Sequence, residues 1–203
     1  MKRIIFAYLL VCFLFNACRQ KENKANQNEA STEAVSDKPT SAPTAYDFDK
    51  IPISKKDIGK FPYLPLPKGY EYKYEKKKEF ELKYFFYNDS LVTAKEGSYF
   101  FSTIWKKENN ASDYEKTFVL KSYVEAITNL GGFEIFSGTL PENGKTLIYK
   151  NKPSYFDDLS QNYAATYKQY LLKTPYKNLW FELFIVDNEQ EIRLSILEEK
   201  VLN

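Results

Sequence analysis

The feature that most constrains the fold of this chain is an abrupt change of composition at Tyr46. Between Arg19 and Ala45 the sequence contains no aromatic residue and is rich in Asn, Gln, Glu, Lys, Ser, Thr, Ala and Pro. Such a stretch cannot bury enough apolar surface to offset the entropy of ordering it. From Tyr46 onward aromatic residues are frequent, and this part is long enough for one domain with a substantial core. We therefore expect a disordered tether over 18–45 and one globular domain over 46–203.

The start of the chain has the organisation of a secretory signal. Basic residues precede a short apolar run, Ile4 to Phe15, and Ala17 is a small residue before the expected cleavage point. The run is shorter than the about 20 residues that a membrane-spanning helix needs. Because Cys18 follows directly, the segment is similar to the signals of bacterial lipoproteins, in which the cysteine receives a diacylglyceryl group. This resemblance implies a signal peptide over 1–17, lipidation of Cys18 and a lipid anchor in the outer membrane, on either its periplasmic or its surface side.

The side chains on which most enzyme mechanisms depend are scarce. The chain has no histidine, which removes Ser–His and Cys–His nucleophiles and the commonest zinc-ligand sets. Cys12 would leave with the signal peptide, so no thiol would remain for a disulfide. Paired carboxylates remain possible, but Asp157 and Asp158 also fit the start of a helix. We expect no catalytic residue, no metal and no cofactor.

Charge does not indicate a nucleic-acid partner. Loss of the signal peptide would remove two basic residues and no acidic residue, which leaves equal numbers of each. Nucleic-acid binding requires a concentrated basic face. We therefore expect the membrane, reached through the N-terminal lipid, and an envelope protein or glycan as partners.

The pattern of apolar residues predicts an α+β fold, with an antiparallel β-sheet packed with one main α-helix in a single domain. Alternation and apolar runs predict strands, with a turn at Asn88-Asp89 or Glu96-Gly97. The segment 145–149 is a candidate partner for the strand at 133–136. The proline-rich segment 57–70 predicts an extended, irregular entry to the domain. The predicted strands are 80–86, 99–105, 133–136, 167–173, 179–186 and 191–197.

A single helix is predicted between residues 112 and 131. Ser112 and Glu115 have the spacing of a capping box, in which the two side chains cap each other's backbone N–H groups. Apolar residues then recur with a helical period as far as Leu130. Gly131 and Gly132 follow, and glycine accepts the left-handed conformation that commonly ends a helix. We expect the helix to stop at Gly131.

Several short motifs after residue 56 resemble the N-terminal domain of OmpA-family envelope lipoproteins. They include Asp57-Ile58-Gly59-Lys60-Phe61-Pro62-Tyr63, Leu66-Pro67-Lys68-Gly69, Phe85-Phe86-Tyr87 and the helix end around Gly131-Gly132. These motifs are structural and carry no known chemistry. In those proteins a peptidoglycan-binding OmpA domain follows, whereas this chain stops at Asn203. The resemblance therefore implies an envelope lipoprotein domain without a peptidoglycan-contact residue to carry over.

The aromatic residues suggest where a partner would bind. The run 179–186 is apolar on nearly both faces, so it either lies centrally under cover on both sides or presents one face to a partner. We select Trp180, Trp105 and Tyr170 as candidate contacts for a partner or a glycan, with burial in the core as the alternative for Trp180. The function expected is a non-enzymatic binding or scaffolding component of the cell envelope. The alternative is a surface glycan-binding lipoprotein that uses exposed aromatic residues.

The lipid anchor gives a direct prediction. Cys18→Ala should yield unprocessed or soluble protein, because stable membrane attachment requires two or more acyl chains. Fractionation of cells followed by a carbonate wash measures this. Retention of the variant in the washed membrane would instead indicate an uncleaved N-terminal anchor.

Overall fold

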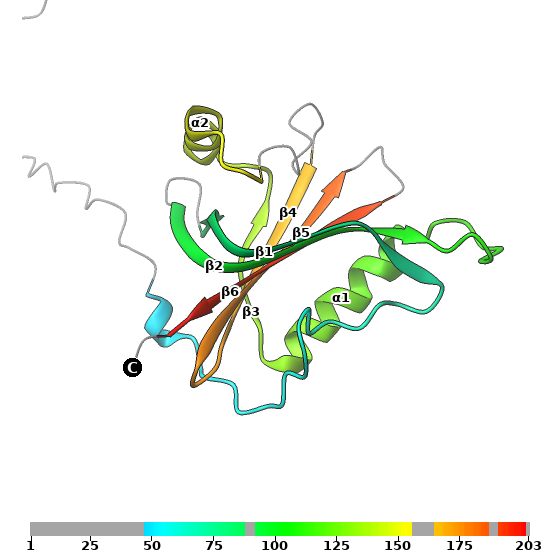
Figure 1. Ribbon diagram of the computed structural model, residues 1–203, viewed down its shortest axis with the longest axis horizontal. Helices are drawn as coiled ribbons and strands as arrows, with labels where there is room; N and C mark the ends of the chain where they lie inside the picture. Colours follow the sequence, from blue (N-terminus) through cyan, green and yellow to red (C-terminus); the bar gives the residue numbers. More distant parts are fainter. Residues whose placement is uncertain (1–46, 88–91, 156–164, 187–190, 202–203) are drawn as a thin grey trace, which may run out of the picture. The chain divides into compact units, whose positions relative to one another are not determined.

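The computed structural model describes residues 47–87, 92–155, 165–186 and 191–201 (Figure 1). One sheet has the strand order β1-β2-β6-β5-β4-β3, and its neighbouring strands are antiparallel. This confirms the predicted antiparallel sheet and the α+β class. The strands are β1 (Tyr70–Phe86), β2 (Val92–Lys106), β3 (Phe133–Gly138), β4 (Ala165–Lys173), β5 (Lys177–Val186) and β6 (Ile192–Lys200). The helices are α1 (Lys116–Leu130), α2 (Glu142–Asn151) and the short 3-10 helix η1 (Phe48–Lys50).

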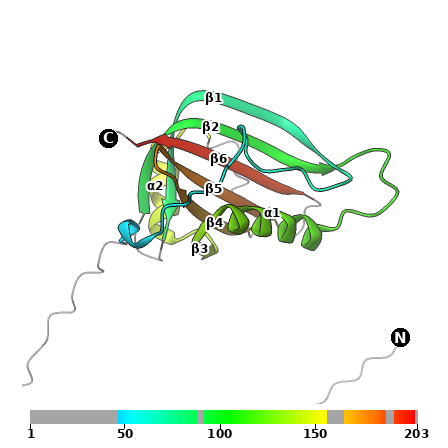
Figure 2. The ribbon, with the colours of Figure 1, turned by 90° about the horizontal axis from the view of Figure 1, so that it is seen from below.

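The two α-helices lie on opposite sides of the sheet (Figures 1 and 2). On one side α1 buries Val119, Tyr123 and Ile127 in a cluster with apolar residues of β2, β4, β5 and β6. On the other side Ile148 of α2 belongs to a second cluster, which contains Trp180. The central strand β5 is therefore covered on both faces, which is the first of the two predicted alternatives for 179–186. Within the described part of the chain, neither helix is long and apolar enough to cross a membrane.

The helix α2 replaces the strand predicted at 145–149. A short apolar run does not distinguish a strand from one turn of a buried helix, so periodicity alone could not decide. Tertiary contact decides instead, because Gly144 faces Phe86 at the end of β1. A Cβ atom at Gly144 would lie 2.8 Å from Cε1 of that ring, so only glycine permits this close approach.

Two local predictions on β2 and α1 were wrong. Glu96-Gly97 is not a turn but lies within β2, where Gly97 packs so closely on β6 that a Cβ would meet the Glu198 carbonyl oxygen. The helix α1 begins at Lys116 with Glu115 as its N-cap and without a side-chain capping bond, so the capping box at Ser112 does not form. The other predicted turn, Asn88-Asp89, lies outside the described residues.

The sheet curls because β1 carries two bulges. Its register against β2 shifts between Lys73 and Lys76 and again between Lys78 and Glu81. Bulges bend a strand and increase its twist. At the first, Ser102 Oγ donates a hydrogen bond of 2.8 Å to the Lys73 carbonyl, which has left the regular ladder.

The curl brings the end of β1 across the sheet to β4 and β3. The Phe86 N–H donates to Gln169 Oε1 at 2.7 Å, and the Phe86 ring lies 5.5 Å from that of Phe136. Inside the curl, Lys83 and Glu182 form a buried ion pair with 2.8 Å between Nζ and Oε1. The Lys83 ammonium also lies 4.2 Å from the centre of the Tyr155 ring. The face opposite α1 is thus enclosed largely by the sheet itself.

The end of α1 confirms the predicted helix stop and gives a second prediction. Gly131 has φ of +96°, and its N–H bonds back to the last turn. Gly131→Val should lower the free energy of unfolding by about 1–2 kcal/mol because of left-handed strain, measured by urea denaturation. A Cβ would also lie 3.0 Å from Ser54 Oγ. Gly59→Val is the control, since Gly59 has φ of +72° but no atom within 4 Å of an added Cβ. Equal losses in the two variants would show that the contact with Ser54 adds nothing.

Candidate functional site

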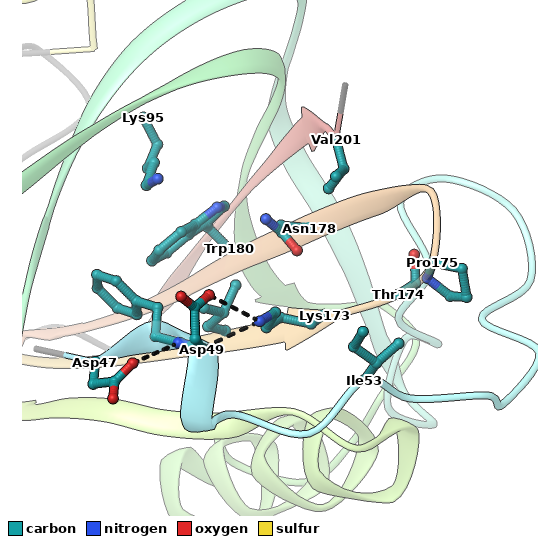
Figure 3. Close-up of a pocket in the computed structure, with 12 residues that line it drawn as sticks. Asp47, Asp49, Ile53, Lys95, Lys173, Thr174, Pro175, Asn178, Trp180 and Val201 are labelled. Carbon is teal, nitrogen blue, oxygen red and sulfur yellow. Dashed lines mark hydrogen bonds and ion pairs between the residues drawn. The ribbon is translucent and has the colours of Figure 1, made fainter. Parts of the chain in front are cut away.

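A cavity of about 570 Å³ opens where η1 lies beside the ends of β4 and β5 (Figure 3). Its volume lies within the range of about 300–1,000 Å³ typical of sites for small ligands. Apolar and polar side chains both contribute to its walls. The lining residues are Asp47, Phe48, Asp49, Ile53, Lys95, Leu171, Lys173, Thr174, Pro175, Asn178, Trp180 and Val201.

Two rows of side chains on the sheet lie at the cavity, and four of their members, Leu171, Trp180, Lys173 and Asn178, line it. Directly paired residues on neighbouring antiparallel strands share a face, so their side chains lie side by side. One row is apolar and consists of Leu171 on β4, Trp180 on β5 and Leu197 on β6. The next row is polar. It consists of Lys173 on β4, Asn178 on β5 and Glu199 on β6.

Glu199 organises the polar row. Its Oε2 accepts hydrogen bonds from Trp180 Nε1 at 2.8 Å and from Asn178 Nδ2 at 3.1 Å. Its Oε1 lies 3.2 Å from Lys95 Nζ. Because the carboxylate can only accept, it fixes the orientation of the Asn178 amide, with the nitrogen toward Glu199. The other amide atom, Asn178 Oδ1, is buried and has no hydrogen-bond partner among the described residues.

Lys173 connects the sheet to η1. Its ammonium donates a hydrogen bond of 3.2 Å to the Phe48 carbonyl and lies 3.8 Å from Asp49 Oδ1. The Asp49 side chain is fully exposed, so water screens this ion pair strongly. Lys173 lines the cavity and reaches from the sheet to η1, as Figure 3 shows.

The structure does not bring the three predicted aromatic contacts together. Trp180 lines the cavity but is only 1% exposed, since Phe48 and Phe85 pack against its ring and Lys95 lies over it. A ligand in the cavity could therefore touch the Trp180 ring only where the Lys95 side chain leaves it uncovered. Trp180 is thus buried in the core, which is the alternative given for this residue from the sequence.

Tyr170 lies on the α1 side of the sheet and away from the cavity. It is buried in the cluster with α1, and its hydroxyl donates to Glu134 Oε2 at 2.7 Å. Burial, and then the hydrogen bond to Glu134, raise the pKa of the Tyr170 phenol above its ordinary value. With a side chain 1% exposed, Tyr170 is not available on the surface of the described domain.

Trp105 lies near the other end of β2 and is 39% exposed. Its indole nitrogen donates to Glu191 Oε2 at 2.9 Å, and its ring meets that of Tyr74 edge-on at 5.8 Å. Tyr74 occupies the first bulge of β1 with φ of +54° and is 67% exposed. The sequence indicated Trp105 as a candidate contact but not Tyr74, because no sequence signal predicts the bulge that turns Tyr74 outward.

Sequence reasoning missed the polar row of the cavity. Lys173 and Asn178 are unremarkable by type, and they become neighbours only through the register of the β4–β5 hairpin. A signal was present in Pro175, a turn-favouring residue between the predicted strands 167–173 and 179–186, from which the pairing of the two could have been derived. The carboxylates Asp157 and Asp158 lie outside the described residues. Among the residues that are described, no three His, Cys, Asp or Glu side chains form a group that could hold a metal.

A second, much smaller cavity lies inside the curl of the sheet. Polar groups of Lys83, Glu182, Arg193 and Ser195 line it together with aromatic rings. Its volume of about 10 Å³ matches a single water molecule at most. The larger cavity is therefore the candidate ligand site. Comparison of the chain with protein-family models, with curated proteins and with solved structures finds no match to any of them.

The different settings of the two tryptophans can be measured. Trp180→Ala should lower the free energy of unfolding by about 3–5 kcal/mol, because it leaves a large void between Phe48 and Phe85. Trp105→Ala is the matched control, and as a surface change away from the core it should cost about 0.5 kcal/mol or less. Acrylamide should quench the fluorescence of the Trp180→Ala protein much more than that of the Trp105→Ala protein. Equal quenching would mean that Trp180 is accessible to solvent.

Proposed function

We propose that this protein is a non-enzymatic binding component of the cell envelope, anchored in the outer membrane through a lipid on Cys18, and that its domain binds a small polar ligand in the cavity beside η1. The observation that carries the proposal is the cavity of about 570 Å³ itself, whose walls combine the polar side chains of Lys173 and Asn178 with the carboxylates of Asp47 and Asp49. A concave site of this size with a few polar groups is typical of small-ligand binding.

The composition of the cavity supports binding of a neutral or weakly charged molecule. Two lysines and two aspartates contribute to its walls, so no single sign of charge prevails. Ile53, which is exposed, and the half-buried Phe48 supply apolar surface near these polar groups. A few polar groups within a partly apolar cavity are the usual basis of specificity in small-molecule sites.

The proposed envelope location rests on the sequence. The basic start, the short apolar run and Cys18 are the parts of a lipoprotein signal. The cavity is lined by Asp47, which closely follows the predicted tether. We infer that ligand would bind at the end of the domain from which the tether leaves.

The exposed Tyr74–Trp105 pair supports a second candidate function, which is glycan binding on the surface. The hydrogen bond from the Trp105 indole to Glu191 fixes the plane of the ring, and neighbouring aromatic rings offer stacking surface. A rigid aromatic surface costs little conformational entropy when a ligand orders it. Charged groups of Glu191 and Arg193 adjoin the pair, with 2.7 Å between Oε1 and Nε.

A variant that fills the mouth of the cavity tests the first proposal. Val201→Trp places a large ring at the rim, whereas the control Tyr176→Trp changes an exposed residue of the nearby β4–β5 turn that does not line the cavity. Saccharide and peptide fragments released from envelopes should raise the melting temperature of the wild type and of Tyr176→Trp. At a hundredfold excess over Kd the stabilisation is about 2.7 kcal/mol.

The same fragments should leave the melting temperature of Val201→Trp unchanged. Stabilisation that persists in Val201→Trp but disappears in Trp105→Ala would favour the Tyr74–Trp105 surface instead. If no fragment stabilises the wild type, the proposal of a small-ligand site is wrong.

A further inference from the structure

We infer that the domain docks on an anionic phospholipid surface through the end at which the expected tether joins it. The inference rests on the proposed lipid anchor and adds a second contact with the same membrane. Three chain segments form the docking surface, which we call the hairpin tip. The hairpin tip consists of residues 52–55, the β4–β5 turn at 173–177 and residues 200–201.

Main-chain contacts hold the three segments of the hairpin tip together. The Ser54 N–H donates to the Lys173 carbonyl at 2.8 Å, and Ile53 forms a parallel bridge with Lys173. The Val201 N–H donates to the Tyr176 carbonyl at 3.3 Å. Figure 1 shows the β4–β5 turn, the end of β6 and the segment after η1 at the same end of the sheet. The three segments therefore form one continuous surface.

The β4–β5 turn presents an aromatic ring to solvent. Thr174 closes this turn, because its hydroxyl accepts from the Lys177 N–H at 3.1 Å and donates to the Lys177 carbonyl at 2.7 Å. Tyr176 is 75% exposed, more than any other large hydrophobic side chain of the described residues. Ile53 and Val201 are exposed on the same surface. Because its ring is apolar and its hydroxyl is polar, tyrosine is enriched where a membrane meets water.

The charge of the hairpin tip is positive. Its segments contain four lysines and no acidic residue. Two of the lysines face the carboxylates of Asp49 and Glu198, so their charge is partly balanced. The other two, Lys55 and Lys200, are exposed and form no ion pair with another described residue. Anionic lipids attract such lysines, whose alkyl stems can lie along apolar surface while the ammonium groups stay in water.

The tether would make even a weak docking surface effective. The chain enters the described domain at Asp47, shortly before the bridge between Ile53 and Lys173. As a flexible coil, the tether expected over 18–45 would span about 30 Å. A link of this length keeps the second contact at a high effective concentration once the first contact is made. The lipid on Cys18 would therefore turn a modest affinity of the hairpin tip into a docked state.

Docking would bring the cavity beside η1 to the level of the lipid headgroups. Ile53, Pro175 and Val201 belong both to the hairpin tip and to the walls of the cavity. The Tyr74–Trp105 pair lies near the other end of β2, so it would stay exposed to solvent in the docked state. The two exposed aromatic surfaces of the domain would thus have different surroundings.

The experiment measures whether the hairpin tip contacts lipid. Cys12 would leave with the signal peptide and Cys18 would be lipidated, so the thiol introduced by Tyr176→Cys would be the only free one. This thiol carries a fluorophore in the full-length lipoprotein, which is reconstituted into vesicles that contain nitroxide-labelled lipids as quenchers. The vesicles consist of phosphatidylcholine alone or of equal parts of phosphatidylcholine and phosphatidylglycerol.

The matched control places the fluorophore at the far end of the domain. Phe118→Cys replaces another exposed aromatic residue in the first turn of α1, where Lys116 contacts the Val186 carbonyl at the opposite end of β5. With phosphatidylglycerol present, the lipids should quench the Tyr176→Cys label at least threefold more strongly than the Phe118→Cys label. The difference should decrease in phosphatidylcholine alone and in about 1 M salt, which shortens the Debye length to about 3 Å.

Charge variants identify the part played by the lysines. Lys55→Gln combined with Lys200→Gln should remove at least half of the quenching of the Tyr176→Cys label on anionic vesicles. Lys107→Gln combined with Lys121→Gln removes the same charge from exposed positions after β2 and in α1, and should leave the quenching unchanged. Melting temperatures show whether each variant is folded.

Several outcomes would overturn the inference. Equal quenching of the two labels, in protein that floats with the vesicles, would show that the hairpin tip does not dock although the lipid anchor holds. Protein that does not float with the vesicles would contradict the anchor and the docking together. Quenching that survives the loss of Lys55 and Lys200 would mean that anionic lipid is not recognised. Self-quenching of the Tyr176→Cys label that grows with protein density would instead identify a second copy of the chain as the partner.

Discussion

The structure depends on the buried ion pair between Lys83 and Glu182. Lys83 belongs to the curled end of β1, and Glu182 belongs to the central strand β5, so the pair connects the folded-over part of the sheet to its middle. Such a pair need not stabilise more than apolar residues would, but removing one partner leaves a buried charge and costs about 3–5 kcal/mol. Gln169 donates to the same carboxylate and accepts from the backbone of Phe86, which fixes where β1 crosses β4.

The curl explains why the domain contains so many aromatic residues. An open sheet with one helix layer would bury one face, whereas here both faces of β5 are covered. Large rings such as Phe86, Tyr167 and Trp180 fill the space that the curl encloses, with edge-to-face contacts between them and their neighbours. Of the three aromatic residues that the sequence offers as partner contacts, Trp180 packs inside the curl, Tyr170 packs against α1, and Trp105 stays at the surface beside Tyr74.

The cavity forms at the end of the sheet where η1 approaches β4 and β5. There Glu199 is the counterpart of Glu182, since each carboxylate collects donors from several strands on the same side of the sheet. The two carboxylates differ in their surroundings. The carboxylate of Glu182 lies in an enclosed core, whereas Glu199 fixes a neighbouring amide whose oxygen has no partner in the described structure.

The sequence by itself determined the antiparallel sheet, the irregular entry segment and the end of α1 at Gly131, because alternation, proline and glycine act through local backbone geometry. It did not determine α2, whose few apolar residues suit either a strand or a helix until Gly144 meets Phe86. Nor did it determine the cavity, because Lys173, Asn178 and Glu199 become neighbours only through strand register. Only the tertiary structure decided these features, since bulges, register and close packing depend on contacts between residues far apart in the chain.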